Sequence, residues 1–146
     1  EKLIEKVIRF GITKSHLEIE ITEGVLIDNL QDTVSKLEII RQMGIGISLD
    51  DFGTGYSSLR YLQMLPLTTL KIDKSFVANI QNGRESNITE SIVSMVSKMG
   101  LDTIAEGVET NEQLEILKKF KCNNLQGFLK GRPMPVELCE KLLSKD

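Results

Sequence analysis

Apolar residues recur along the chain in two alternating patterns. Short runs rich in Ile, Leu and Val alternate with longer segments in which apolar positions lie three and four residues apart. Short apolar runs are typical of buried strands, and the longer spacing is typical of amphipathic helices. The alternation predicts βα units around a parallel sheet, and therefore an α/β fold. Strands are expected at 16–22, 46–50, 69–73, 103–106 and 124–128.

Helix signals fill the segments between these strands. Gly11, Gly44 and Gly100 each follow an apolar-periodic stretch, where glycine commonly ends a helix, and Thr110 with Gln113 has the spacing of a capping box. The opening segment EKLIEKVIRFG is itself amphipathic. Helices are expected there and at 30–43, 56–64, 88–99, 112–120 and 136–144.

Composition narrows the class of protein. The 146 residues, 40% of them hydrophobic, fit one globular unit. Eighteen basic and 21 acidic residues give a net charge of -3 without a basic run, which argues against polymeric nucleic acid as a partner. Cys122 and Cys139 lack metal-ligand spacing and are expected to be reduced thiols in the cytoplasm.

The ends of the chain suggest a piece of a longer protein, because the sequence lacks an initial Met and opens within a helical pattern. No apolar run approaches the roughly 18–20 residues that cross a bilayer. We therefore expect no membrane contact by this segment, although a parent protein could be membrane-anchored.

Polar residues gather where the predicted strands end. In parallel α/β folds, ligands bind beyond the carboxyl ends of the strands, because the loops there carry polar groups over a rigid scaffold. The residues at that edge are Glu20, Glu23, Asp50, Asp51, Lys71, Asp73, Glu106, Glu109 and Gln126.

A cation is the expected partner of these carboxylates. Two carboxylates about 4 Å apart repel by about 1 kcal/mol in water and about 4 kcal/mol at an effective dielectric of 20. Oxygen ligands without thiolate or imidazole favour Mg²⁺, Mn²⁺ or Ca²⁺, and the single histidine, His16, precedes the end of its strand. We expect Mg²⁺ or Mn²⁺.

Simpler interpretations exist for single residues. Asp50 and Asp51, followed by FGTGYSS, could form only a helix-capping turn, and the stem of Lys71 could simply pack against the sheet. Glu106 or Gln126 alone could also be structural. The glycine-rich stretch lacks the GKS or GKT ending of a P-loop. The ordered set at successive strand ends favours a site.

Five motifs occur in order at these strand ends: LEIEITE, DDFGTGYSSL, LKIDKSFV, IAEGVET and LQGFLKGRP. Together they resemble the EAL family of cyclic di-GMP phosphodiesterases, over about residues 17–133. The resemblance implies a TIM-like barrel with its site at the carboxyl ends of the strands. It also implies two-metal hydrolysis of cyclic di-GMP to the linear dinucleotide pGpG, with Mg²⁺ or Mn²⁺ as cofactor.

The resemblance also implies roles for individual residues. Glu20 and Asp50 would bind a metal ion, and Asp51 would bind or orient a second one. Lys71 would hold the attacking water or stabilise phosphoryl charge. Glu106 would act as the base and as a partner of the second metal.

Further positions match the family outside this central group. Gln126 would contact the substrate, and Glu23 and Glu109 would stabilise the loop after Asp51. The loop DDFGTGYSSL and the helix after it would contribute to a homodimer interface.

The chain also departs from the family pattern. It contains neither the Glu-Ala-Leu motif nor the site asparagine of the family, and Phe128 stands where tyrosine is usual. A complete barrel has eight strands in about 250 residues, whereas the pattern here gives about five βα units. We therefore expect residues 1–146 to be the C-terminal part of a single EAL domain, with an incomplete barrel. The exposed edges of its sheet should favour association. Alone, this chain should bind metal weakly and have little or no activity.

Two other functions fit the same residues. A degenerate EAL domain could sense cyclic di-GMP or bind a protein without hydrolysis, and a fragment could serve only in dimerisation. Retention of Lys71, Gln126 and every matched acidic residue favours the enzyme.

Overall fold

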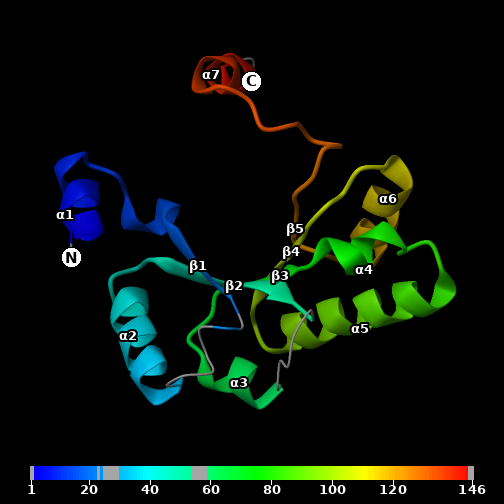
Figure 1. The fold of residues 1–146 in the computed structure, drawn as a ribbon, viewed down its shortest axis with the longest axis horizontal. Coiled ribbons are helices and arrows are strands. Elements are labelled where there is room, and N and C mark those ends of the chain that lie inside the picture. Colours follow the sequence, from blue (N-terminus) through cyan, green and yellow to red (C-terminus); the bar gives the residue numbers. More distant parts are fainter. Residues whose placement is uncertain (1, 23, 25–29, 54–58, 145–146) are drawn as a thin grey trace.

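The computed structural model describes residues 2–22, 24, 30–53 and 59–144. Five strands form one parallel sheet in which neighbours in sequence are neighbours in space (Figure 1). The predicted α/β fold with a parallel sheet is confirmed. The strands are β1 Glu18–Thr22, β2 Gly46–Phe52, β3 Thr69–Ile72, β4 Asp102–Ala105 and β5 Asn124–Leu125.

Helices connect successive strands, and further helices precede β1 and follow β5. Between successive strands they return the chain so that each new strand runs parallel to the last. The helices are α1 Lys2–Arg9, the 3₁₀ turn η1 Lys14–His16, α2 Leu30–Gln42, α3 Leu59–Met64, α4 Lys74–Ala78, α5 Gly83–Lys98, α6 Asn111–Lys119 and α7 Val136–Leu143.

One face of the sheet is apolar and covered by helices. Ile47 and Leu49 of β2 and Leu70 and Ile72 of β3 are fully buried, in one cluster with residues of α2 and α5. Figure 1 shows α2, α3 and α5 on the same side of the sheet. Because side chains alternate along a strand, the residues between these apolar positions point to the opposite face. That face is polar, and it carries the candidate site.

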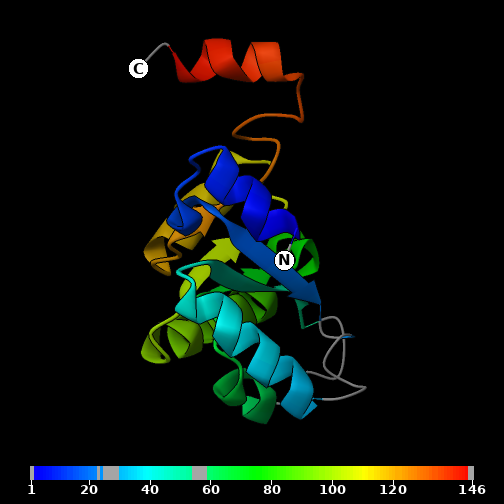
Figure 2. The same cartoon turned by 90° about the vertical axis from the view of Figure 1, so that its left-hand side faces the viewer.

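The last helix stands apart from the sheet. An extended segment after β5 leads to α7, which lies away from the other elements in both views (Figures 1 and 2). No residue of α7 is buried, and its apolar residues Val136, Leu138, Leu142 and Leu143 are exposed. The apolar spacing that predicted this helix therefore has no described contact surface.

Several predicted bounds were wrong for identifiable reasons. Helix α5 begins at Gly83 and not at 88, because its first five residues, GRESN, are polar and carry no apolar spacing. Strand β5 ends at Leu125 and not at 128, because residues 127–130 turn back on themselves, with Lys130 N donating to Gly127 O at 3.1 Å. The 3₁₀ turn η1 delays β1 until Glu18, and the short helix α4 was not predicted.

The residues predicted to begin and end helices were identified more accurately than these bounds. Thr110 and Gln113 form the capping box reciprocally. Gly11, Gly44 and Gly100 each have a positive φ, as glycines that end helices do. The predicted helix at 56–64 is described from Leu59, and its first residues lie outside the described part of the chain.

Candidate metal and catalytic site

A bulge in β2 places two aspartates opposite one lysine. Leu49 pairs with Leu70 and Phe52 pairs with Ile72, so two residues of β2 match one residue of β3. In a regular strand Asp50 and Asp51 would point to opposite faces. Asp51 instead has a φ of 54°, a backbone conformation that Asp tolerates better than most residues. Its N–H donates to Asp50 Oδ1 at 3.0 Å.

The lysine opposite this bulge binds three carboxylates at once. Lys71 Nζ lies 2.9 Å from Glu20 of β1, 3.0 Å from Asp50 of β2 and 2.8 Å from Glu106, which follows β4. The side chain of Lys71 is 6% exposed. Residues of β1 and β2 and the residue after β4 therefore meet at one buried ammonium group of β3.

The environment keeps this ammonium group charged. Burial alone would lower the pKa of Lys71, because it removes the charge from water. Hydrogen bonds to Glu106, Glu20 and Asp50 outweigh burial and raise the pKa above its ordinary value. With these three carboxylates in contact, Lys71 is positively charged at neutral pH.

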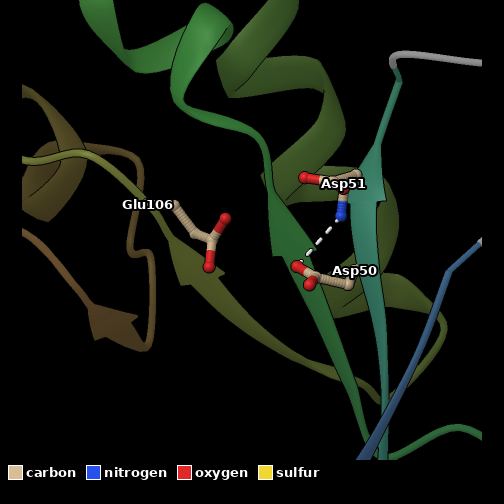
Figure 3. A group of neighbouring side chains, drawn as sticks. All are labelled: Asp50, Asp51 and Glu106. Atoms are coloured by element: carbon tan, nitrogen blue, oxygen red, sulfur yellow. Dashed lines mark hydrogen bonds between the residues drawn. The ribbon is translucent and has the colours of Figure 1, made fainter.

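Three carboxylates form a group suited to a cation. One oxygen from each of Asp50, Asp51 and Glu106 lies within 4.8 Å of the others. Figure 3 shows both aspartates reaching from β2 across β3 towards Glu106. A group of carboxylate oxygens without nitrogen or sulfur fits a hard divalent ion. Within the described part of the chain, Glu20 is not one of these three carboxylates, but it contacts the same Lys71 ammonium.

The loop after Glu106 is held tightly in place. Glu106 N donates to Ile72 O at 3.0 Å, so the residue continues the register of β4 beside β3. Gly107 follows with a φ of 68°, and a Cβ at this position would lie 2.6 Å from Cβ of Lys74. Only glycine fits this close approach between the loop and the start of α4. The backbone at Glu106 and Gly107 is thereby fixed.

Gln113 fastens the rest of this loop. Its side-chain Oε1 accepts hydrogen bonds from the N–H groups of Glu109 and Thr110, and its Nε2 donates to Val77 O of α4. Gln113 is buried. The side chain of Glu109 is exposed at this point, and its role in stabilising the loop after Asp51 stays a prediction.

The remaining predicted site residues lie at the edge of this group or outside it. Gln126 follows β5, donates from its N–H to Ala105 O at 2.9 Å and is exposed. Its backbone is therefore anchored next to Glu106, while its contact with substrate stays a prediction. Glu23 and the loop residues 54–58 lie outside the described residues.

Ser48 is a polar residue that the sequence reasoning missed. It pairs in register with Glu20 and Thr69, on the polar face of the sheet, and is 1% exposed. Within the described part of the chain, its hydroxyl has no hydrogen-bond partner. The signal was a serine inside the otherwise apolar run Ile47–Leu49, two residues before Asp50.

Comparison with known families identifies this arrangement. The family model described as EAL domain matches residues 1–133. The chain belongs to the EAL domain family. Its parallel sheet and helices accordingly form part of the TIM-barrel-like fold of EAL domains.

Two similar proteins are named as phosphodiesterases. This EAL chain is 44% identical over 134 residues to the cyclic di-GMP phosphodiesterase NbdA of Pseudomonas aeruginosa, covering 91% of the chain and 17% of NbdA. A structure of the MucR phosphodiesterase from the same organism, in complex with c-di-GMP, matches with a TM-score of 0.86 and 43% identity, covering 94% of this chain and 56% of that one.

A third similar protein was solved with a metal. The manganese and cyclic di-GMP complex of Klebsiella pneumoniae BlrP1 matches with a TM-score of 0.83 and 32% identity, over 90% of this chain and 34% of that one. The EAL chain thus spans about a sixth of NbdA, somewhat more than half of the MucR chain and about a third of the BlrP1 chain. Among its described residues, no helix is both long and apolar enough to cross a membrane.

Proposed function

We propose that the EAL domain formed with this chain hydrolyses cyclic di-GMP to linear pGpG in a reaction that depends on Mg²⁺ or Mn²⁺. The observation that carries the proposal is the meeting of Asp50, Asp51 and Glu106 beside the buried ammonium of Lys71. This group lies at the carboxyl ends of the strands, where TIM-type folds hold their active sites. The names of NbdA and MucR point to the same substrate.

The donor set fits the proposed ions. Glu20, Asp50, Asp51 and Glu106 offer only carboxylate oxygens, which suit Mg²⁺ and Mn²⁺, and the BlrP1 complex contains manganese. Two such ions, when bound, lower the pKa of water and offset negative charge on the reacting phosphate. We assign Glu20, Asp50 and Asp51 to holding them.

The other residues act on the water and the substrate. Lys71 stays protonated, so it orients the attacking water and stabilises negative charge on the phosphoryl oxygens. Glu106 is the carboxylate that can accept a proton from that water. Gln126, anchored beside Glu106, donates from its side-chain amide to the dinucleotide. Glu23 and Glu109 stabilise the loop after Asp51.

A single-turnover assay tests this proposal. Excess chain is incubated with cyclic di-GMP and Mn²⁺, and pGpG is measured by chromatography. We expect pGpG to form slowly, because this chain has neither the Glu-Ala-Leu motif nor the asparagine of the family. Formation of pGpG should be lost when a chelator is added and in the variant Glu106→Gln. Binding of cyclic di-GMP without any pGpG would support the sensor function instead.

We further propose that two copies associate through the loop 50–59 and helix α3. Leu59 and Met64 of α3 and Ile88 of α5 are exposed apolar residues. Two adjoining grooves of about 630 and 830 Å³ lie between α3 and α5; Leu59, Ser91 and Met95 line both, and Ile88 lines the larger one. Burial of such residues is the usual source of association energy in a homodimer.

The oligomeric state of surface variants tests the interface. Sedimentation of the wild-type chain should show a dimer, and Leu59→Glu should shift it to a monomer. Val136→Glu is the matched control, because Val136 is as exposed as Leu59 but lies on α7. A monomeric wild type, or a dimer in both variants, contradicts this interface.

The two cysteines support a proposed location for this segment. Cys122 and Cys139 are both free in the structure. Free thiols persist in reducing compartments, and we propose that this segment works in the cytoplasm. Alkylation of both thiols in freshly lysed cells, without prior reduction, would support this location.

A further inference from the structure

We propose that Lys71 is the built-in counter-ion of the site, which holds the carboxylates together without metal and which divalent ions must displace. This inference rests on the proposed metal-dependent function. It adds that ion binding is opposed by a residue of the chain itself.

The contacts of Lys71 have the number and arrangement expected of a bound cation. A lysine ammonium has three N–H donors. Here three carboxylates, from Glu20, Asp50 and Glu106, lie at 2.8–3.0 Å from Nζ. Each donor has one carboxylate, and the side chain is almost fully buried.

The same carboxylates serve the metal group. Asp50 and Glu106 are two of the three residues whose oxygens gather within 4.8 Å, and both also bind Lys71. A divalent ion on those oxygens would lie close to the ammonium and repel it. The two cations therefore compete for shared ligands, and bound ions reduce the hold of the carboxylates on Lys71.

The competition between the Lys71 ammonium and the divalent ions has a functional consequence. The ammonium keeps four carboxylates from β1, β2 and the end of β4 in position before any ion arrives, because it binds three of them and Asp51 is fixed to Asp50 through its backbone N–H. Ion binding then weakens the contacts of Lys71 with these carboxylates. Its N–H donors become available to water or to a phosphoryl oxygen only when the ions are present. Lys71 is thus coupled to ion loading by shared ligands.

Manganese affinity measures the coupling directly. Free Mn²⁺ is titrated by electron paramagnetic resonance against the wild-type chain, Lys71→Met and Lys118→Met. Lys118 is a matched control, because it pairs with Glu115 at 2.9 Å on the exposed side of α6. We expect Lys71→Met to bind Mn²⁺ at least about tenfold more tightly than wild type, and Lys118→Met to be unchanged.

Thermal unfolding of the same proteins gives a second readout. Without metal, Lys71→Met should melt at a lower temperature than wild type, because three carboxylates lose their cation. Saturating Mn²⁺ should raise its melting temperature more than it raises that of wild type. A purely structural lysine would also lower the melting temperature, but it would leave the Mn²⁺ affinity unchanged.

The outcomes separate the two proposals. If wild type binds Mn²⁺ and Lys71→Met binds it equally or more weakly, the counter-ion role is wrong while the metal site stands. If neither protein binds Mn²⁺, both proposals fail. Binding by Lys71→Met alone supports the counter-ion role most strongly.

A measurement on the unmodified side chain covers the case in which Lys71→Met does not fold. In the ¹⁵N-lysine-labelled chain, the Lys71 ammonium should give a protected NMR signal, assigned by its absence in Lys71→Arg. Saturating Mg²⁺ should shift this signal or broaden it beyond detection, and the signal of Lys118 should not change. A Lys71 signal unaffected by saturating Mg²⁺ overturns the inference.

Discussion

Lys71 and Glu106 form an ion pair of 2.8 Å between the interior of β3 and the residue that follows β4. The contact depends on the β3–β4 register, in which Ile72 pairs with Ala105 and accepts from Glu106 N. The site is therefore a product of correct strand pairing. Mutations that test it must separate loss of chemistry from loss of the sheet.

Asp51→Asn should weaken Mn²⁺ binding by about tenfold or more, because it removes one charged ligand and leaves all three ion pairs of Lys71 in place. Asparagine also tolerates the positive φ of this position, so the stability should change little. Titration calorimetry at high protein concentration checks the affinity. Asp102→Asn, at the opposite end of β4, is the control. Unchanged affinity in Asp51→Asn would remove Asp51 from the ligand set.

The carboxylate of Asp73 should make stability depend on pH. Burial would raise the pKa of Asp73, but its hydrogen bonds with Ser75 at the start of α4 outweigh burial and lower the pKa. A lowered folded-state pKa stabilises the fold above the unfolded-state value, about 3.9, and that stability is lost as pH falls through the folded-state value.

Asp73→Asn isolates this effect, because asparagine caps a helix without titrating. At pH 7 the wild type should exceed Asp73→Asn by up to about 1 kcal/mol in free energy of unfolding. The difference should shrink steadily below about pH 4 in urea unfolding experiments. A difference that stays constant down to pH 2 would show that the charge of Asp73 contributes nothing.

Gly107→Ala should destabilise the chain by about 2–4 kcal/mol, since alanine is strained at a φ of 68° and its Cβ would overlap that of Lys74. Gly83→Ala is the contrasting variant. Gly83 starts α5, and a Cβ there meets nothing within 4 Å. Urea unfolding should show a gain of about 0.5–1 kcal/mol for Gly83→Ala. Equal effects of the two substitutions would contradict the described loop.

Gln113→Leu should cost about 2–4 kcal/mol in unfolding free energy, because it leaves the N–H groups of Glu109 and Thr110 and the carbonyl of Val77 without their partner. Gln113→Glu keeps the acceptor and loses only the donor to Val77. It should therefore fall between wild type and Gln113→Leu. Gln42→Leu, at the exposed end of α2, should change stability by less than about 0.5 kcal/mol.

The sequence predicted the sheet well because its cause is local. The Ile, Leu and Phe side chains of Gly46–Phe52 and Thr69–Ile72 are buried, and their alternation predicts strands directly. The short helix α4 was missed because its start depends on capping by Asp73, and the polar start of α5 was missed because it carries no apolar spacing. The exposed apolar face of α7 shows that spacing predicts a helix without predicting its neighbour.

The candidate site was predictable as a set of residues but not as a geometry. Strand-end positions of Glu20, Asp50, Lys71 and Glu106 were enough to bring them to one edge of the sheet. The sequence did not show that Lys71 contacts three of the carboxylates, because this depends on its burial between strands. It also gave no sign that Gln126 would be exposed beyond a strand of only two residues.

The bulge in β2 makes the number of residues as important as their identity. Phe52 lies on the apolar face beside Ile72 only because the bulge absorbs the extra residue that separates it from Leu49. Deleting either aspartate would let β2 pair regularly with β3, so Phe52 would keep its place beside Ile72 while the bulge and one carboxylate were lost. A transplanted site must therefore carry the extra residue as well as the aspartates.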